Sequence, residues 1–340
     1  MPVELVFSWT VVFIASEWVI RVVMLAVVVE RHPPRSAMTW LLVIFFLPWP
    51  GLLLYLLIGE NRLPQGRLLR RRALMQRLES VRDRYVHHRD GLSVELDDEF
   101  AATVTLAEKL GYMPIMHGNT ADLLADTDDV INRLIADIDA AEHHVHLLFY
   151  IFEADETGER VEQALVRAVQ RGVRCRLLVD AQGSRHFLKK RAKHLRAQGI
   201  ELYAALPGGL LRVWVSRIDL RNHRKIAVID GWIGYTGSQN IVSAGYGHKD
   251  LRWYDLMARM RGPVVLELQA VFVGDWLAES DELLDGPAIF PELSALPGGI
   301  AIQALPSGPL FSVENYQRLV VAALYSAKRQ VTITTPYFVP

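Results

Sequence analysis

The chain has 340 residues, of which 51% are apolar, and its 37 Lys and Arg nearly balance its 38 Asp and Glu to give a formal net charge of -1. This length allows two domains, and this composition excludes an intrinsically disordered chain. The single cysteine, Cys175, excludes an internal disulfide framework and a thiolate metal cluster, and it favours a reducing, cytosolic location.

The N-terminal sequence is strongly apolar. From about Leu5 to Val29 the only charged residues are Glu17 and Arg21. This stretch is long enough to cross the ~30 Å hydrocarbon layer of a membrane as a helix. Because Glu17 and Arg21 are four residues apart, we expect them to pair on one face of that helix.

A second apolar run covers residues 37–58, and Pro-Trp-Pro-Gly at 48–51 interrupts it. This run predicts a kinked span or a hairpin that dips into the bilayer, so residues 1–60 are expected to form a two-span transmembrane hairpin. The arginine-dense segment that follows is interpreted as a juxtamembrane linker over residues 61–112. It either marks topology alone or also lies against anionic headgroups. By the positive-inside rule, both termini and the domain after the linker are cytoplasmic.

Helix and strand patterns alternate after the linker. Helices are predicted at 128–141, 158–171 and 189–198, and strands at 145–152, 173–179 and 200–204. This βαβ order predicts an α/β domain with a mostly parallel or mixed buried sheet, which we place over residues 113–298.

A partial internal repeat follows this domain. Residues 135–152 align with residues 321–338 under a constant shift of about 186 positions. The second copy is therefore assigned to residues 299–340, with one helix and one strand. Two elements cannot bury a core alone, so this tail is expected to pack on the first copy, to belong to a longer protein, or to be poorly ordered.

The segment 222–240 holds the residues most indicative of chemistry. Two apolar strands flank Asp230-Gly231, a tight-turn signal, and are predicted to form a hairpin. The period of two along a strand gives each strand a polar pair on one face: His223 with Lys225, and Ser238 with Asn240. If those faces coincide, an imidazole, an ammonium, a hydroxyl and an amide converge without a carboxylate. Such a set suits an anion, most simply phosphate.

The spacing within 223–240 is His-x-Lys, four residues, Asp, six residues and Gly-Ser-x-Asn, and it resembles the signature of the phospholipase D superfamily at every motif position. The apolar N-terminus and several flanking stretches are similar to bacterial cardiolipin synthases. These stretches are Tyr150-Ile-Phe with Asp155 and Gly158, residues 172–180, residues 221–225, Trp253-Tyr-Asp255 and Gly262-Pro263. The resemblance covers nearly the whole chain. It implies an α-β-α domain of the phospholipase D type and a multi-pass protein of the bacterial inner membrane.

The resemblance also implies a phosphatidyltransferase that converts two phosphatidylglycerol molecules into cardiolipin and glycerol through a phosphatidyl-histidine. The roles that it implies are catalytic for His223 as nucleophile, Lys225 and Asp230, phosphate-binding for Lys225, Ser238 and Asn240, and histidine-orienting for Asp255. Asp230 has a structural explanation as well, because Asp before Gly is typical of a tight turn.

The expected partners are phosphatidylglycerol and anionic membrane lipids, and no nucleic acid. No cofactor is expected. His143, His144 and His146 lie close together in sequence, but without a matching pattern of Cys or carboxylates they are not interpreted as a metal site.

The family pattern needs a second His-x-Lys motif, and the repeat would place it about 186 residues after His223, beyond Pro340. We therefore expect little or no synthase activity from this chain alone. A homodimer or a missing C-terminal half would complete the site, and truncation is the preferred explanation. Two alternatives stay open: a membrane-bound phospholipase D or phosphodiesterase that uses water, and a non-catalytic truncated homologue that binds anionic lipid.

Overall fold

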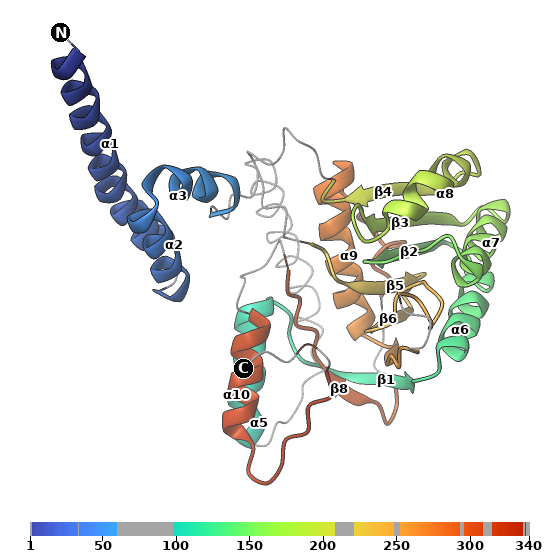
Figure 1. The fold of residues 1–340 in the computed structure, drawn as a ribbon. Coiled ribbons are helices and arrows are strands. Elements are labelled where there is room, and N and C mark those ends of the chain that lie inside the picture. Colours follow the sequence, from blue (N-terminus) through green and yellow to red (C-terminus); the bar gives the residue numbers. More distant parts are fainter. Residues whose placement is uncertain are drawn as a thin grey trace. The chain divides into compact units, whose positions relative to one another are not determined.

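The computed structural model describes residues 2–32, 34–59, 98–207, 221–247, 252–292, 296–308, 315–335 and 337. The chain divides into a helical N-terminal unit and an α/β unit (Figure 1). Residues 61–97 of the predicted arginine-rich linker lie outside the described residues, as does the run His248-Lys249-Asp250.

The N-terminal unit contains α1 (Pro2–Arg31), α2 (Pro34–Phe46), α3 (Pro48–Leu54) and a short π-helix, η1 (Tyr55–Gly59). Within the described residues, one helical segment, Trp9–Arg31, is long and apolar enough to span a membrane by length and composition. The second apolar run forms shorter helices and breaks at Leu47, because Pro48 has no N–H to continue the hydrogen-bond ladder of α2.

The helices of this unit pack on one another through a small apolar cluster. Its members are Ile20, Met24, Val28, Ala37, Ile44 and Tyr55. Arg21 lies 3.4 Å from Glu17, which confirms the predicted pair, and its Nε donates to the carbonyl of Phe45 on α2 at 3.1 Å. The guanidinium is thus satisfied within the unit, as an apolar environment requires.

A mixed sheet forms the centre of the α/β unit. In the described part of the chain its strand order is β4-β3-β2-β5-β6-β7-β1-β8. The strands are β1 (Met116–Leu124), β2 (His144–Phe149), β3 (Arg174–Asp180), β4 (Glu201–Ala205), β5 (Lys225–Ile229), β6 (Ile233–Gly237), β7 (Met257–Arg261) and β8 (Ile300–Ile302). Strands β2, β3 and β4 are parallel, and the other neighbours are antiparallel. The prediction of an α/β domain with a mixed sheet is confirmed.

Helices cover both faces of the sheet (Figure 1). One face carries α6 (Thr127–Asp139), α7 (Glu156–Gln170) and α8 (Arg185–Ala197), and the other carries α9 (Val264–Ser280). The alternation along β2 shows how the sheet separates two cores, since Val145 and Leu147 pack under α6 and α7 while Leu148 joins the cluster around α9.

The tail that the sequence assigns to a second copy packs on the α/β unit. Strand β8 pairs with β1, and α10 (Asn315–Ser326) lies beside α5 (Asp98–Gly111) (Figure 1). The side-chain amide of Asn315 donates to the carbonyl of Leu110 at 2.7 Å. Helix α10 coincides with the helix expected there, whereas the described residues 331–335 do not form the expected strand.

Candidate active site

Five strand ends meet at one edge of the sheet. Strands β2 and β3 are parallel and end there, and β5 is antiparallel to them and begins there. Phe149 pairs with Lys225, and Gly237 at the end of β6 pairs with Met257 at the start of β7. The sheet therefore brings the His-x-Lys and Gly-Ser-x-Asn segments together, as the predicted hairpin requires.

The opposite edge holds the turn of the β5–β6 hairpin. Asp230 and Gly231 have φ angles of 53° and 70°, the left-handed pair typical of a tight hairpin turn. The Asp230 carboxylate accepts the backbone N–H groups of Glu142, His143 and His144 at 2.7–2.8 Å. Asp230 thus fixes the start of β2, and the structure does not bring it to His223.

His223 lies just before β5 and stacks on Tyr150, with ring centroids 4.0 Å apart and an interplanar angle of 17°. The ammonium of Lys225 donates to the carbonyl of His223 at 2.7 Å and lies 5.6 Å from the centroid of the same tyrosine ring. Sequence reasoning places His223 and Lys225 on a strand face, but β5 begins only at Lys225. The stack on Tyr150, rather than strand geometry, fixes the plane of the imidazole.

Ser238 and Asn240 follow β6 at the same edge. The Ser238 hydroxyl is exposed and accepts the Leu256 N–H at 3.0 Å. Asn240 is buried, and its Oδ1 accepts the N–H of Ile151 at 2.9 Å. Orientation of the amide by this hydrogen bond leaves its NH₂ group as the donating end.

Gly237 allows β6 and β7 to approach beside Ser238. A Cβ atom at this position would lie 2.2 Å from the carbonyl oxygen of Leu256. A larger residue would therefore push β7 away from the serine.

Two carboxylates act on the two basic groups. Burial and the neighbouring Lys225 lower the pKa of His223, and Asp180 opposes this shift. Burial lowers the pKa of Lys225, and Asp255 opposes that shift. Asp180 is fully buried at the end of β3, where it accepts the N–H groups of Gln182 and Gly183 at 2.9 Å. The charge of Asp255 therefore acts on Lys225, and the charge of Asp180 acts on the imidazole.

Tyr150 and Asp180 are functional candidates that sequence reasoning assigned no role. The sequence carries a usable signal for Asp180. Asp180 directly follows a predicted parallel strand, and ligands in such sheets bind beyond the carboxyl ends of the strands.

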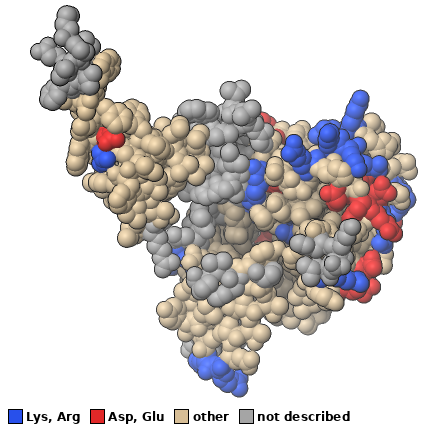
Figure 2. Space-filling model, viewed as in Figure 1, with Lys and Arg blue, Asp and Glu red and all other residues tan. Residues whose placement is uncertain are grey.

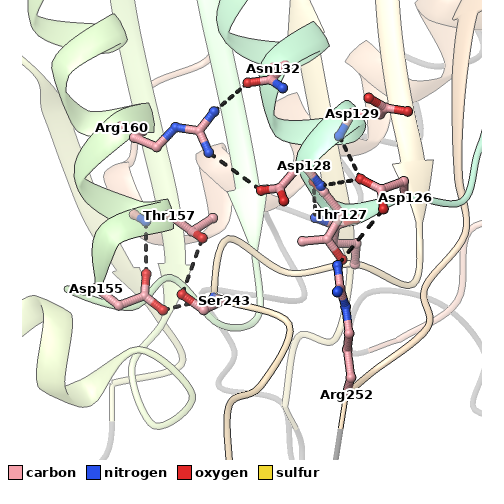
Figure 3. A network of polar contacts seen from close by, with 12 residues as sticks. Asp126, Thr127, Asp128, Asp129, Asn132, Asp155, Thr157, Arg160, Ser243 and Arg252 are labelled. Carbon is pink, nitrogen blue, oxygen red and sulfur yellow. Dashed lines mark hydrogen bonds and ion pairs between the residues drawn. The ribbon is translucent and has the colours of Figure 1, made fainter.

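Asp155 holds the loop that follows Asn240 (Figure 3). One carboxylate oxygen accepts the N–H of Gly158 at the start of α7, and the other accepts the N–H of Ser243 at 2.8 Å. The hydroxyls of Thr157 and Ser243 lie 3.3 Å apart. The first turn of α7 is therefore tied to the loop that carries the Gly-Ser-x-Asn residues.

Within the described ranges, no group of three or more His, Cys, Asp and Glu side chains is arranged to hold a metal ion. His144 and His146 are buried on the α9 side of the sheet, where Gln269 hydrogen-bonds to the His146 ring. These histidines therefore lie away from the edge that holds His223.

Comparison with known proteins gives matches along the chain. Residues 134–276 match the family model described as cardiolipin synthase, PLD-like domain, and residues 9–60 match the model described as phospholipase D-nuclease N-terminal. Cardiolipin synthase A of Edwardsiella ictaluri is 36% identical over 98% of this chain and 70% of its own length. Cardiolipin synthase A of Salmonella arizonae is 35% identical over the same shares.

Among solved structures, NucT from Helicobacter pylori superposes with a TM-score of 0.38 at 16% identity, over 47% of this chain and 98% of its own. The family assignment rests on the sequence matches, which extend from the apolar N-terminus through the α/β unit. The chain belongs to the cardiolipin synthase family of the phospholipase D superfamily and is a phosphatidyltransferase.

Proposed function

We propose that His223 takes a phosphatidyl group from phosphatidylglycerol and passes it to the hydroxyl of a second phosphatidylglycerol. In the first step an imidazole nitrogen bonds to phosphorus, the bond from phosphorus to the glycerol oxygen breaks, and glycerol leaves with a proton. In the second step the acceptor oxygen bonds to phosphorus, its hydroxyl proton passes to the base left by the general acid of the first step, the phosphorus–nitrogen bond breaks, and cardiolipin forms. The observation that carries this proposal is the convergence of His223, Lys225, Ser238 and Asn240 at one sheet edge.

The surroundings of His223 suit a nucleophile. A lowered pKa keeps the imidazole in its free-base form near neutral pH, and only that form can attack phosphorus. Bonding to phosphorus then places a positive charge on the ring. The face of Tyr150, stacked at 4.0 Å, is a surface on which a cationic ring is stabilised.

Lys225, Ser238 and Asn240 supply donors for the nonbridging oxygens of the phosphate. Lys225 carries the positive charge of the set, and Asp255 helps to keep it protonated. The exposed hydroxyl of Ser238 and the amide NH₂ of Asn240 add neutral donors. Donors that are fixed before the reaction stabilise the charge that grows in the transition state.

The leaving glycerol needs a proton from a general acid, and the 340 residues carry one His-x-Lys motif. We propose that a second motif completes the site, either from further chain or from a second copy of this chain in a two-fold dimer.

The membrane arrangement is part of the same proposal. Helix α1 is proposed as one span, and the run that forms α2 and α3 as the return arm of a two-span hairpin. Both termini and the α/β unit would then lie on the cytoplasmic side of a bacterial inner membrane, facing phosphatidylglycerol headgroups.

The experiment is a product analysis with phosphatidylglycerol in lipid nanodiscs. The protein is tested both as a dimer of this chain and as a chain extended to include the second motif. Transfer predicts cardiolipin and glycerol, whereas water as acceptor predicts phosphatidic acid. The His223→Ala variant should form neither, and His194→Ala, an exposed histidine on α8, is the matched control. Phosphatidic acid as the sole product would replace the transferase with a hydrolase, and full activity of His223→Ala would exclude both.

A further inference from the structure

Helix α8 carries an exposed basic surface. The helix contains six Lys and Arg and no Asp or Glu in 13 residues. Its buried residues, Phe187, Ala192 and Leu195, face the core, and the opposite side is exposed. Figure 2 shows Lys and Arg gathered at the upper right, where Figure 1 places α8.

Two of the six cations are already engaged. Arg191 pairs with Glu162, with Nη2 and Oε2 2.8 Å apart, and Arg196 donates to the carbonyl of Leu202 at 2.9–3.1 Å. The other four cations form no ion pair with the described part of the chain. We call them the α8 basic surface: Arg185, Lys189, Lys190 and Lys193.

The spacing within this surface costs stability in the isolated chain. Arg185, Lys189 and Lys193 follow one another at intervals of four, so like charges are neighbours along one stripe. The neighbouring helix α7 places Glu156 and Glu159 in its first turn, whereas α8 offers no acid to its own lysines. An anionic partner would remove this repulsion.

We propose that the α8 basic surface rests on anionic phospholipid headgroups and positions the α/β unit on the membrane that holds its substrate. The exposed side of α8 carries no large apolar side chain, so the contact is electrostatic adsorption rather than insertion. This inference deepens the proposed function, because the same lipid class supplies the substrate.

The start of α8 is fixed to the candidate active site. The Ser184 hydroxyl, one residue before the helix, donates to the carbonyl of Tyr150 at 3.0 Å and accepts the N–H of Phe152 at 2.9 Å. Tyr150 in turn stacks on His223. Adsorption of α8 would therefore hold the edge that carries His223 at a defined height above the headgroups.

The first experiment measures lysine acetylation by mass spectrometry in the full chain, reconstituted in nanodiscs of phosphatidylglycerol or of phosphatidylcholine. Lys189, Lys190 and Lys193 should react several-fold more slowly in phosphatidylglycerol, and this protection should disappear near 1 M salt, where the Debye length is ~3 Å. Lys109, exposed on α5, should react equally in both lipids. Equal rates for the α8 lysines in both lipids would overturn the inference.

The second experiment measures energy transfer from a probe on α8 to an acceptor lipid. The probe is attached to Gln198→Cys, at the end of α8; the native Cys175 is buried and burial raises its pKa to about 12, so it should not react. Transfer should be higher in phosphatidylglycerol than in phosphatidylcholine. The combined substitutions Lys189→Gln, Lys190→Gln and Lys193→Gln should abolish that difference.

A matched triple variant removes the same charge from other exposed positions: Lys109→Gln, Arg133→Gln and Arg174→Gln. It should keep the difference in energy transfer between the two lipids. An equal loss in both triple variants would show a net-charge effect and overturn the assignment to α8, as would protection of the α8 lysines by added double-stranded DNA alone. Neither experiment needs turnover, so this inference can fail while the proposed function stands, and the reverse also holds.

Discussion

Lys225 and Asp230 lie at opposite ends of β5, although the motif joins them in sequence. The two positions are five residue steps apart along an extended chain, which is about 16 Å at ~3.3 Å per residue. Lys225 faces the edge with His223, whereas the Asp230 carboxylate accepts three backbone N–H groups at the start of β2. The motif therefore runs from the candidate active site at Lys225 to the hairpin turn at Asp230.

Replacing Asp230 should damage the fold rather than the chemistry. Asp230→Ala leaves three N–H groups without their acceptor and should lower the free energy of unfolding by about 3 kcal/mol. Asp230→Asn keeps one acceptor oxygen and tolerates the left-handed backbone, so its loss should be smaller. Urea unfolding measures both, and labelling of His223 by a phosphodiester measures the chemistry. A stable Asp230→Asn variant with no labelling would contradict the structural role.

Gly237 should tolerate no side chain. Gly237→Ala sets a Cβ against the Leu256 carbonyl, should cost about 1–3 kcal/mol, and should displace Ser238. Gly245→Ala is the control, because a Cβ there meets nothing within 4 Å and should change stability by less than about 0.5 kcal/mol. Thermal unfolding of both variants, with phosphate-analogue binding, tests the contrast. Similar behaviour of the two variants would show that β6 and β7 have room to separate.

Tyr150 should act on His223 through its ring. Tyr150→Leu should slow labelling of His223 about tenfold to a hundredfold, as expected for loss of an aromatic stack and a cation–π contact. Tyr150→Phe keeps the ring and should keep most of the rate. The substrate should be a phosphodiester whose leaving group needs no proton, so that a missing general acid does not limit the rate.

The control for Tyr150 is Tyr203→Leu. Tyr203 lies on β4 and packs edge-on against Trp276, with ring centroids 5.0 Å apart. Loss of the stack should also expose the imidazole and raise the pKa of His223, because burial is the main cause of its lowering. Exchange of the imidazole C–H followed by mass spectrometry reports that pKa. An unchanged pKa and rate in Tyr150→Leu would remove Tyr150 from the site.

His144 should make stability depend on pH. Burial lowers the pKa of His144 from 6.5 to about 4. Between those values the unfolded chain binds a proton that the folded chain does not, so stability falls as pH decreases from 6.5 to 4. The full loss is about 3 kcal/mol. Urea unfolding across this range measures how the free energy of unfolding changes with pH, and this dependence should be weaker in His144→Phe. His194→Phe, which replaces an exposed histidine, should keep the wild-type dependence. The same pH dependence in wild type and His144→Phe would contradict this prediction.

The sequence predicted the elements whose patterns are local. The helices and strands of the βαβ units and the β5–β6 hairpin follow from periodicity and from Asp230-Gly231. Helix α9 was not predicted. Residues 264–278 are buried on all sides, so the sequence lacks the alternation of a polar and an apolar face that indicates a helix. Strands β1 and β7 were not predicted either, because their place in the sheet depends on pairing with distant segments.

The motif residues of the candidate site were found because their spacing is distinctive. The contact between Tyr150 and His223 joins residues 73 positions apart by number and depends on β5 pairing with β2 in the observed register. The same holds for Asp180, whose charge acts on the imidazole because β3 lies beside β2. Such contacts are set by strand order, which local patterns do not contain.

A search for a phosphatidyl group on His223 tests the proposed mechanism most directly. The full chain would be incubated with a phosphodiester lipid whose leaving group needs no proton, quenched at alkaline pH, digested and analysed by mass spectrometry. A phosphatidyl-histidine mechanism predicts an acid-labile adduct on the peptide containing His223, absent from His223→Ala and present in His194→Ala. An adduct on another residue, or turnover with the same rate in His223→Ala, would contradict it.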